Sequence, residues 1–141
     1  MSQPEMEVDK YGIKYWFLNG KYHCEDGPAI EEPDGTKCWY FDGLLHREDG
    51  PAIEEPDGPK CWYLNGSLHR EDGPAVEEPD GTKCWYLHGN LHREDGPAVE
   101  EPDGRKYWYL NDEEVSWEQV FRQAKNPEIE LRILSAALIT S

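Results

Sequence analysis

The chain has 141 residues, which fits one domain of ordinary size, and its 30 acidic and 14 basic residues give a formal net charge of -16. This excess of negative charge argues against direct binding to nucleic acid or to an anionic membrane surface, because both are polyanions. Apolar residues make up 37% of the chain, too few for a large single core. The six tryptophans and eight tyrosines are nevertheless too many for a disordered acidic tail.

Residues 1–10 are expected to form an N-terminal tail. They contain no basic stretch followed by an apolar run, so the sequence predicts no secretory signal, and no later segment is apolar enough to span a membrane. Four cysteines without such a signal indicate free thiols in a reducing compartment, and we therefore expect a cytoplasmic protein.

Residues 11–112 are dominated by a 23-residue repeat. One repeat reads KCWYLNGSLHREDGPAVEEPDGT and fills positions 60–82. Four full repeats occupy positions 14–105, and a fifth begins at Lys106 and departs after Asn111. A lysine and a tryptophan recur at this spacing: Lys14, Lys37, Lys60, Lys83 and Lys106, and Trp16, Trp39, Trp62, Trp85 and Trp108.

Each repeat contains two turn signals. Asn65-Gly66, between two apolar runs, is typical of a two-residue hairpin loop, because both positions need a positive φ. The second signal is Glu-Pro-Asp-Gly, as at 78–81, where proline fixes φ and glycine supplies the left-handed position. The segments Cys-Trp-Tyr-Leu and Leu-His-Arg-Glu are predicted strands, and Asp-Gly-Pro at 72–74 should interrupt the longer strand.

The two turns also predict the register of the strands. The Asn-Gly loop pairs Leu64 with Ser67, Tyr63 with Leu68, Trp62 with His69, and Cys61 with Arg70. A three-residue Pro-Asp-Gly loop places Ala75 beside Trp85 and Val76 beside Cys84. Alternation then puts the tryptophan and histidine on one face and the cysteine, tyrosine and arginine on the other. The predicted fold is mainly β, an antiparallel meander of repeated β-hairpins in an elongated single sheet.

Residues 113–141 differ from the repeats and are predicted to form a C-terminal helical hairpin cap. Ser116 and Gln119 have the spacing of a capping box, and Asn126-Pro127 resembles a second helix start, so we expect helices over 116–125 and 127–139. One expected buried face carries Trp117, Val120, Phe121 and Ala124, and the other carries Leu131, Leu134 and Leu138.

The C-terminal helices have two interpretations, and a substitution at Asp112 affects the hairpin before them. The helices either cover the open end of the repeats or bind a partner or a second copy, since Ile129, Ile133 and Ile139 are expected to be exposed. Asp112 replaces the turn glycine of the last repeat, so we expect that hairpin not to close.

The repeat resembles a variant of the MORN repeat, similar to the YwqK-type antitoxin family and the HREDGPA repeat proteins of bacteriophages and large DNA viruses. The resemblance covers residues 11–111, and its matching residues are Trp62-Tyr63, Asn65-Gly66, Leu68-His69-Arg70-Glu71-Asp72-Gly73-Pro74-Ala75 and Asp80-Gly81. It implies an extended sheet built from hairpins. It also implies a toxin-neutralising or anti-defence binder in the cytoplasm of a bacterium or of a virus-infected host cell.

Cysteine and histidine recur once per repeat, but we interpret both as structural. Equivalent cysteines should lie about 10 Å apart, too far for a disulfide or a shared metal ion, and Tyr15 and Tyr107 fill the same position. Cys24, which replaces the arginine of later repeats, is expected to be an exposed thiol. Each histidine is expected to pack on tryptophan and to bond to a neighbouring turn, with pH sensing as the alternative. The residues concerned are Cys38, Cys61 and Cys84, and His23, His46, His69 and His92.

The carboxylates form rows, because each repeat carries Glu-Asp before Gly-Pro and Glu-Glu before Pro-Asp-Gly. They either keep a thin aromatic sheet soluble or present a ladder of negative charge that imitates a nucleic-acid backbone. Calcium is the weaker alternative, because no known calcium-loop pattern is present, and we predict no metal site. The candidate partner-binding residues are Glu48, Asp49, Glu54, Glu55, Glu71, Asp72, Glu77, Glu78, Glu94, Asp95, Glu100 and Glu101, with Trp39, Trp62, Trp85, His46, His69 and His92 as aromatic anchors.

The repetition also argues against catalysis, because catalytic sites are normally singular and every polar group here is copied. The sequence therefore predicts a non-enzymatic, cofactor-free inhibitor that neutralises a basic, nucleic-acid-acting protein, with no direct nucleic-acid or membrane partner. Two alternatives remain open. One is a structural or assembly module that forms a homo-oligomer through the C-terminal helices. The other is a small-ligand sink with aromatic pockets between repeats.

Overall fold

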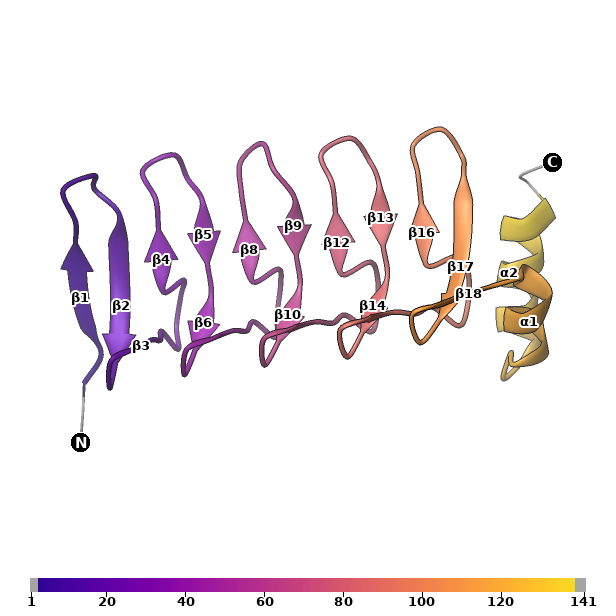
Figure 1. Cartoon of the computed structure of the whole chain (residues 1–141), viewed down its shortest axis with the longest axis horizontal. Helices are drawn as coiled ribbons and strands as arrows, with labels where there is room; N and C mark the ends of the chain where they lie inside the picture. Colours follow the sequence, from indigo (N-terminus) through magenta and orange to yellow (C-terminus); the bar gives the residue numbers. More distant parts are fainter. Residues whose placement is uncertain (1–2, 139–141) are drawn as a thin grey trace. The chain divides into compact units, whose positions relative to one another are not determined.

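The computed structural model describes residues 3–138, and the chain divides into two compact units between Leu68 and His69. Both units consist of short antiparallel strands, and the second also contains two helices at its C-terminal end (Figure 1). The fold is therefore mainly β, a meander of repeated hairpins followed by two helices, as predicted.

In the first unit, neighbouring strands follow the order β1-β2-β4-β5-β8-β9, and β3, β6–β7 and β10–β11 form the hairpin tips. The strands are β1 (Glu5–Val8), β2 (Lys14–Leu18), β3 (Lys21–Tyr22), β4 (Ile30–Glu31), β5 (Lys37–Cys38), β6 (Tyr40–Phe41), β7 (Leu44–Leu45), β8 (Ile53–Glu54), β9 (Lys60–Cys61), β10 (Tyr63–Leu64) and β11 (Ser67–Leu68). The segment expected to be a tail thus contains β1, which pairs with β2.

In the second unit, the order is β12-β13-β16-β17-β18, and β14–β15 form a hairpin tip. The elements are β12 (Val76–Glu77), β13 (Lys83–Cys84), β14 (Tyr86–Leu87), β15 (Asn90–Leu91), β16 (Val99–Glu100), β17 (Lys106–Leu110), β18 (Glu113–Val115), α1 (Trp117–Arg122) and α2 (Pro127–Leu138). The C-terminal segment predicted as a helical cap therefore begins with a strand, β18.

Both predicted turns form, and they set the register of the hairpins. Asn65 and Gly66 have φ values of 49° and 82°, and Tyr63 faces Leu68 as predicted. At the other turn, the Glu78 amide donates to the Thr82 carbonyl at 2.9 Å, which closes a three-residue loop. The predicted pairing of Val76 with Cys84 follows.

The two faces of the strands in the first unit have different chemistry. One face carries an alternating charged row, in which Glu31 lies between Lys14 and Lys37, and Glu54 between Lys37 and Lys60. Opposite charges directly across neighbouring strands stabilise the pairing by about 0.2–1 kcal/mol each. The other face carries an apolar row, listed in spatial order as Tyr15, Ile30, Cys38, Ile53 and Cys61.

The predicted pairing of Cys61 with Arg70 was wrong. The amide of Arg70 donates to the carbonyl of Tyr86 in the next repeat, at 3.1 Å, and Arg47 bonds to Tyr63 in the same way. The preceding histidine keeps its predicted place, because the His46 amide donates to the Trp39 carbonyl at 3.0 Å. The chain therefore leaves its own hairpin after the histidine, which strict alternation along one strand does not anticipate.

The last hairpin closes, contrary to the expectation drawn from Asp112. Leu110 pairs with Glu113, and Asn111 and Asp112 adopt positive φ values of 49° and 68°. Asp112 also bonds twice to Leu91: its amide donates to the Leu91 carbonyl, and its Oδ1 accepts from the Leu91 amide at 2.7 Å. An aspartate tolerates the left-handed conformation because its short side chain can bond nearby backbone groups.

The first helix begins where it was predicted but ends at Arg122, before the predicted end at 125. Ser116 and Gln119 make the complete capping box, and Asn126 Oδ1 accepts from the Ile129 amide at 2.9 Å to start α2. Val120 is buried, and Trp117, Phe121 and Ala124 pack around it, as expected for one helical face.

The predicted buried face of α2 was wrong. Ile133 is fully buried against Trp108 and Val120, whereas Leu131 and Leu138 are 65% and 67% exposed. The helix thus buries the face of Ile129, Ile133, Ala136 and Ala137, and of the three predicted leucines only Leu134 is partly buried. Of the three isoleucines expected to be exposed, Ile133 is buried, Ile129 is partly buried, and Ile139 lies outside the described residues.

Candidate partner-binding surface

An arginine in the second repeat organises the residues around it. Arg47 Nε donates to Asp49 Oδ1 at 2.9 Å, and its Nη1 donates to the Pro51 carbonyl at 3.0 Å and to Glu54 Oε1 at 3.1 Å. The guanidinium carbon lies 3.8 Å from the centroid of the Trp39 ring. One cation is thus held by two carboxylates, a carbonyl and an aromatic face.

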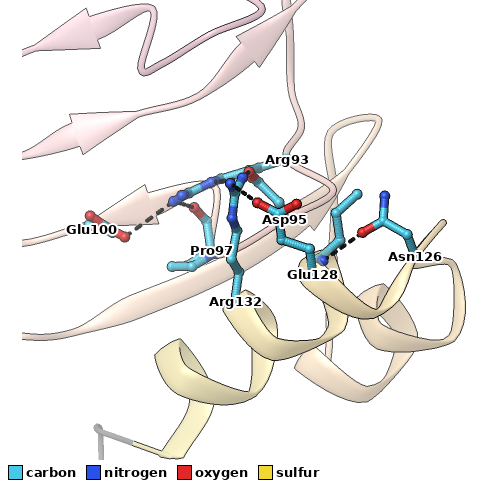
Figure 2. Close-up of polar contacts among 8 residues, drawn as sticks. Arg93, Asp95, Pro97, Glu100, Asn126, Glu128 and Arg132 are labelled. Carbon is cyan, nitrogen blue, oxygen red and sulfur yellow. Dashed lines mark hydrogen bonds and ion pairs between the residues drawn. The ribbon is translucent and has the colours of Figure 1, made fainter.

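This arginine cluster recurs in the third and fourth repeats. Figure 2 shows Arg93, which donates to Asp95, Pro97 and Glu100 at 2.8, 3.0 and 3.2 Å. The Arg93 guanidinium lies 3.8 Å from the centroid of the Trp85 ring. In the third repeat, Arg70 donates to Asp72, Pro74 and Glu77 at 3.1, 3.0 and 3.5 Å. Sequence reasoning missed the clusters because it placed arginine and tryptophan on opposite faces, although the fixed Arg-x-Asp spacing was a usable signal.

The clusters divide the twelve predicted carboxylates into two groups. Six of them pair with the repeat arginines, and Glu101 pairs with Arg105 at 2.9 Å. The other five are exposed: Glu48, Glu55, Glu71, Glu78 and Glu94. Each arginine offsets one of its two carboxylates, so the repeat surface keeps a negative excess, and the second group is exposed without being paired to a repeat arginine.

The histidines connect successive repeats through one ring atom. Nδ1 of His23, His46, His69 and His92 accepts from the backbone amide of the next hairpin turn, at 2.9 to 3.0 Å. The expected bond to a neighbouring turn is therefore confirmed. The rings of His23 and His69 also pack on the next hairpin, 4.4 Å from the Phe41 ring and 4.6 Å from the His88 ring. Because Nδ1 accepts a hydrogen bond, the ring proton sits on Nε2.

The predicted aromatic anchors are largely committed to structural contacts. Trp39 and Trp85 lie beneath arginines, and Trp62 is partly buried. His69 is buried, and His46 and His92 are half-buried. Trp39 and His46 also line an open cleft in the first unit, and Trp85 and His92 line one in the second.

Open clefts lie between the acidic loops of successive repeats. A cleft of about 760 Å³ in the first unit is bordered by the loop at 24–28, by the loop at 47–49 and by Trp39. The second unit has an equivalent cleft of about 590 Å³ between the loops of Asp72 and Asp95. Arg132 of α2 stands at its rim.

Arg132 links the second helix to the last complete repeat, as Figure 2 shows. Its guanidinium lies 2.7 Å from Glu128 on the same helix and 3.3 Å from Asp95 Oδ2. Lys106 Nζ adds a bond of 3.1 Å to the Ala136 carbonyl. The side chain of Asp95 is consequently 35% exposed, against 87% for Asp49 and for Asp72.

The thiols lack the features of reactive cysteines. Burial raises the pKa of Cys38 and Cys84, and nearby glutamates raise it further, so both stay protonated at neutral pH. Cys24 is half-buried rather than exposed, and its thiol donates to Asp26 Oδ1 at 3.3 Å. Among residues 3–138, no three histidine, cysteine or acidic side chains lie together so that they could hold a metal ion.

No helix in the described part of the chain is long and apolar enough to cross a membrane. Comparison with known proteins gives no further guide to function: no family model, no curated protein and no solved structure matches the chain.

Proposed function

We propose that this chain is a MORN-like repeat protein that binds and neutralises a basic, nucleic-acid-acting protein without catalysing a reaction itself. An antitoxin or a phage inhibitor of host defence fits this role, with the exposed carboxylates occupying the groove that normally receives a polyanion. The observation that carries the proposal is the repetition of exposed glutamates beside each arginine cluster, on a chain of net charge -16. Regularly spaced negative charge speeds association with a basic surface, mainly at low salt.

Three exposed glutamates, Glu48, Glu71 and Glu94, immediately precede the arginine-paired aspartates and take no part in the arginine clusters. Glu71 is 83% exposed and Glu94 is 45% exposed, so each can contact a partner without breaking an arginine cluster. The arginine-paired aspartates and glutamates keep the loops in shape. This separation suggests that the exposed glutamates supply binding and the clusters supply rigidity.

The test is capture of proteins from a bacterial lysate by the immobilised full chain, at low and at high salt. We expect a basic protein that is recovered at low salt and released at high salt. The captured protein should act on nucleic acid, and the free chain should inhibit that activity. Recovery of no basic protein at low salt would contradict the proposal.

A matched pair of variants separates the repeat surface from overall charge. The triple variant Glu48→Gln, Glu71→Gln, Glu94→Gln should lose most of the capture and the inhibition. The control Glu5→Gln, Glu113→Gln, Glu118→Gln changes the net charge equally, at exposed positions outside the four full repeats. Equal losses in both variants would show that only net charge matters.

A second candidate, an assembly module, is favoured by one observation. Leu131 and Leu138 leave an apolar stripe exposed on α2, on the face opposite the buried Ile133. Light scattering would support this role if it showed a defined homo-oligomer that is insensitive to salt and is lost in Leu131→Glu.

A further inference from the structure

The first repeat has the acceptors of the arginine cluster but lacks the arginine. Trp16, Asp26, Pro28 and Glu31 stand where Trp39, Asp49, Pro51 and Glu54 surround Arg47, and Cys24 stands in place of the arginine itself. The aspartate, proline and glutamate at these positions hold a guanidinium in three later repeats, and in the second and fourth repeats the guanidinium also lies over the tryptophan ring.

The backbone frame of the first repeat matches that of the filled copies. The Trp16 amide donates to the Ala29 carbonyl at 2.8 Å, as Trp39 does to Ala52 at 2.7 Å. Glu31 pairs with strand residues Lys14 and Lys37, just as Glu54 pairs with Lys37 and Lys60. The backbone that carries these acceptors therefore has the same arrangement as in the repeats that hold an arginine.

No internal cation takes the place of the arginine. Among residues 3–138, no side chain donates to the Pro28 carbonyl or to the Glu31 carboxylate, and no cation lies over the Trp16 ring. Cys24 satisfies one oxygen of Asp26 with a weak thiol bond of 3.3 Å. The loop at 24–28 borders the open cleft of the first unit, so Asp26 and Pro28 adjoin solvent.

We infer that the first repeat binds the guanidinium of an arginine side chain from a protein partner, in the position that Arg47, Arg70 and Arg93 fill in the later repeats. The guanidinium would stack on Trp16, donate to Asp26 and Glu31 and reach the Pro28 carbonyl. The guanidinium cation and the two carboxylates attract each other. The planar guanidinium can donate to several of these acceptors at once, which a lysine ammonium does less well. The source of the arginine rests on the proposed function, because a basic partner supplies it.

One neighbour differs between the first repeat and the others. Met6 of β1 lies across from Trp16, where the corresponding neighbour of Trp39 is alanine. Its side chain is flexible and the residue is 47% exposed, so it can move aside when a guanidinium enters. The Met6→Ala variant should therefore bind at least as well as the natural chain.

The test is an NMR titration of the full chain with N-acetyl-arginine amide, which presents the side chain without a free carboxylate. We expect saturable shifts of the Trp16 indole and of the amides at 26–28, with smaller shifts for N-acetyl-lysine amide. Asp26→Asn should weaken the binding by about tenfold, the loss expected for a hydrogen bond to a charged group. The variant Cys24→Arg should fill the site, abolish the shifts and raise the denaturant midpoint.

The outcomes distinguish this inference from the proposed function. Shifts that persist in Cys24→Arg, shifts of equal size around Asp49, or none at Trp16 would overturn the arginine site. If the titration succeeds but no basic protein is captured from a lysate, the site stands and the proposed function fails. If a basic protein is captured equally by the natural chain and by Cys24→Arg, the function stands and arginine recognition by the first repeat fails.

Discussion

At the scale of single residues, each repeat histidine joins two repeats through one hydrogen bond. His69 is 8% exposed, its Nδ1 accepts from the His88 amide at 2.9 Å, and the two rings lie 4.6 Å apart. The ring therefore satisfies a turn amide that no backbone carbonyl reaches.

We expect His69→Ala to lower the free energy of unfolding by about 1–3 kcal/mol, because a partly buried amide loses its acceptor and the ring contact disappears. The measurement is urea denaturation followed by tryptophan fluorescence. The control is His88→Asn, which installs the residue found at the same turn position in Asn19, Asn65 and Asn111. If His69→Ala lowered the free energy of unfolding less than the control does, the hydrogen bond between His69 and the His88 amide would be dispensable.

Single residues also show which strand pairings could be predicted from the sequence and which could not. Asn65-Gly66 fixed the pairing of Tyr63 with Leu68 because its backbone conformation is determined locally. Arg70 was misplaced because its position depends on the next repeat, to which its amide bonds. The arginine proposed to bind the first repeat could not be predicted from the sequence, because it depends on the contacts that Arg47 makes with Asp49, Pro51 and Glu54.

At the scale of elements, the Glu-Pro-Asp-Gly turns are organised by an aspartate that accepts from the backbone two residues later. Asp80 Oδ1 accepts from the Thr82 amide at 2.8 Å, and the equivalent residues Asp34 and Asp103 do the same. These hydrogen bonds lower the pKa of all three carboxyl groups.

The lowered pKa values predict acid sensitivity. A carboxyl whose pKa is lower in the folded state stabilises the fold above its unfolded pKa of about 3.9, and this stabilisation is lost as the pH falls below that value. The triple variant Asp34→Asn, Asp80→Asn, Asp103→Asn keeps an acceptor oxygen but cannot titrate. Its melting temperature should therefore fall less than that of the natural chain between about pH 5 and pH 2.

The control for this experiment is Asp57→Asn, because Pro59 removes the amide that would otherwise donate to this aspartate. Melting temperatures followed by circular dichroism over the same pH range provide the measurement. Parallel curves for the triple variant and the natural chain would contradict the role assigned to the turn aspartates.

For the helices, the sequence predicted where each one starts but not which face of α2 is buried. Capping chemistry located the start of each helix, because Ser116, Gln119 and Asn126 act on adjacent backbone groups. The buried face of α2 was misassigned because leucines and isoleucines share the helical period, and packing against Trp108 selects Ile133. Periodicity gives the existence of an apolar face, whereas the neighbouring elements decide which of two faces is buried.

At the scale of the whole molecule, the 23-residue period makes one repeat removable. Ile30 faces Cys38 as Ile53 faces Cys61, so deleting residues 37–59 lets Ile30 face Cys61 in the same register. Because repeats interact mainly with their neighbours, the shortened chain should remain folded, with a denaturant m-value lower roughly in proportion to the residues removed.

Deletion of 38–61 removes one residue more, joins Lys37 to Trp62 and moves each following side chain to the opposite face. We expect that variant to lose cooperative unfolding in urea, and equal cooperativity in both deletions would contradict a fold held together by repeat register.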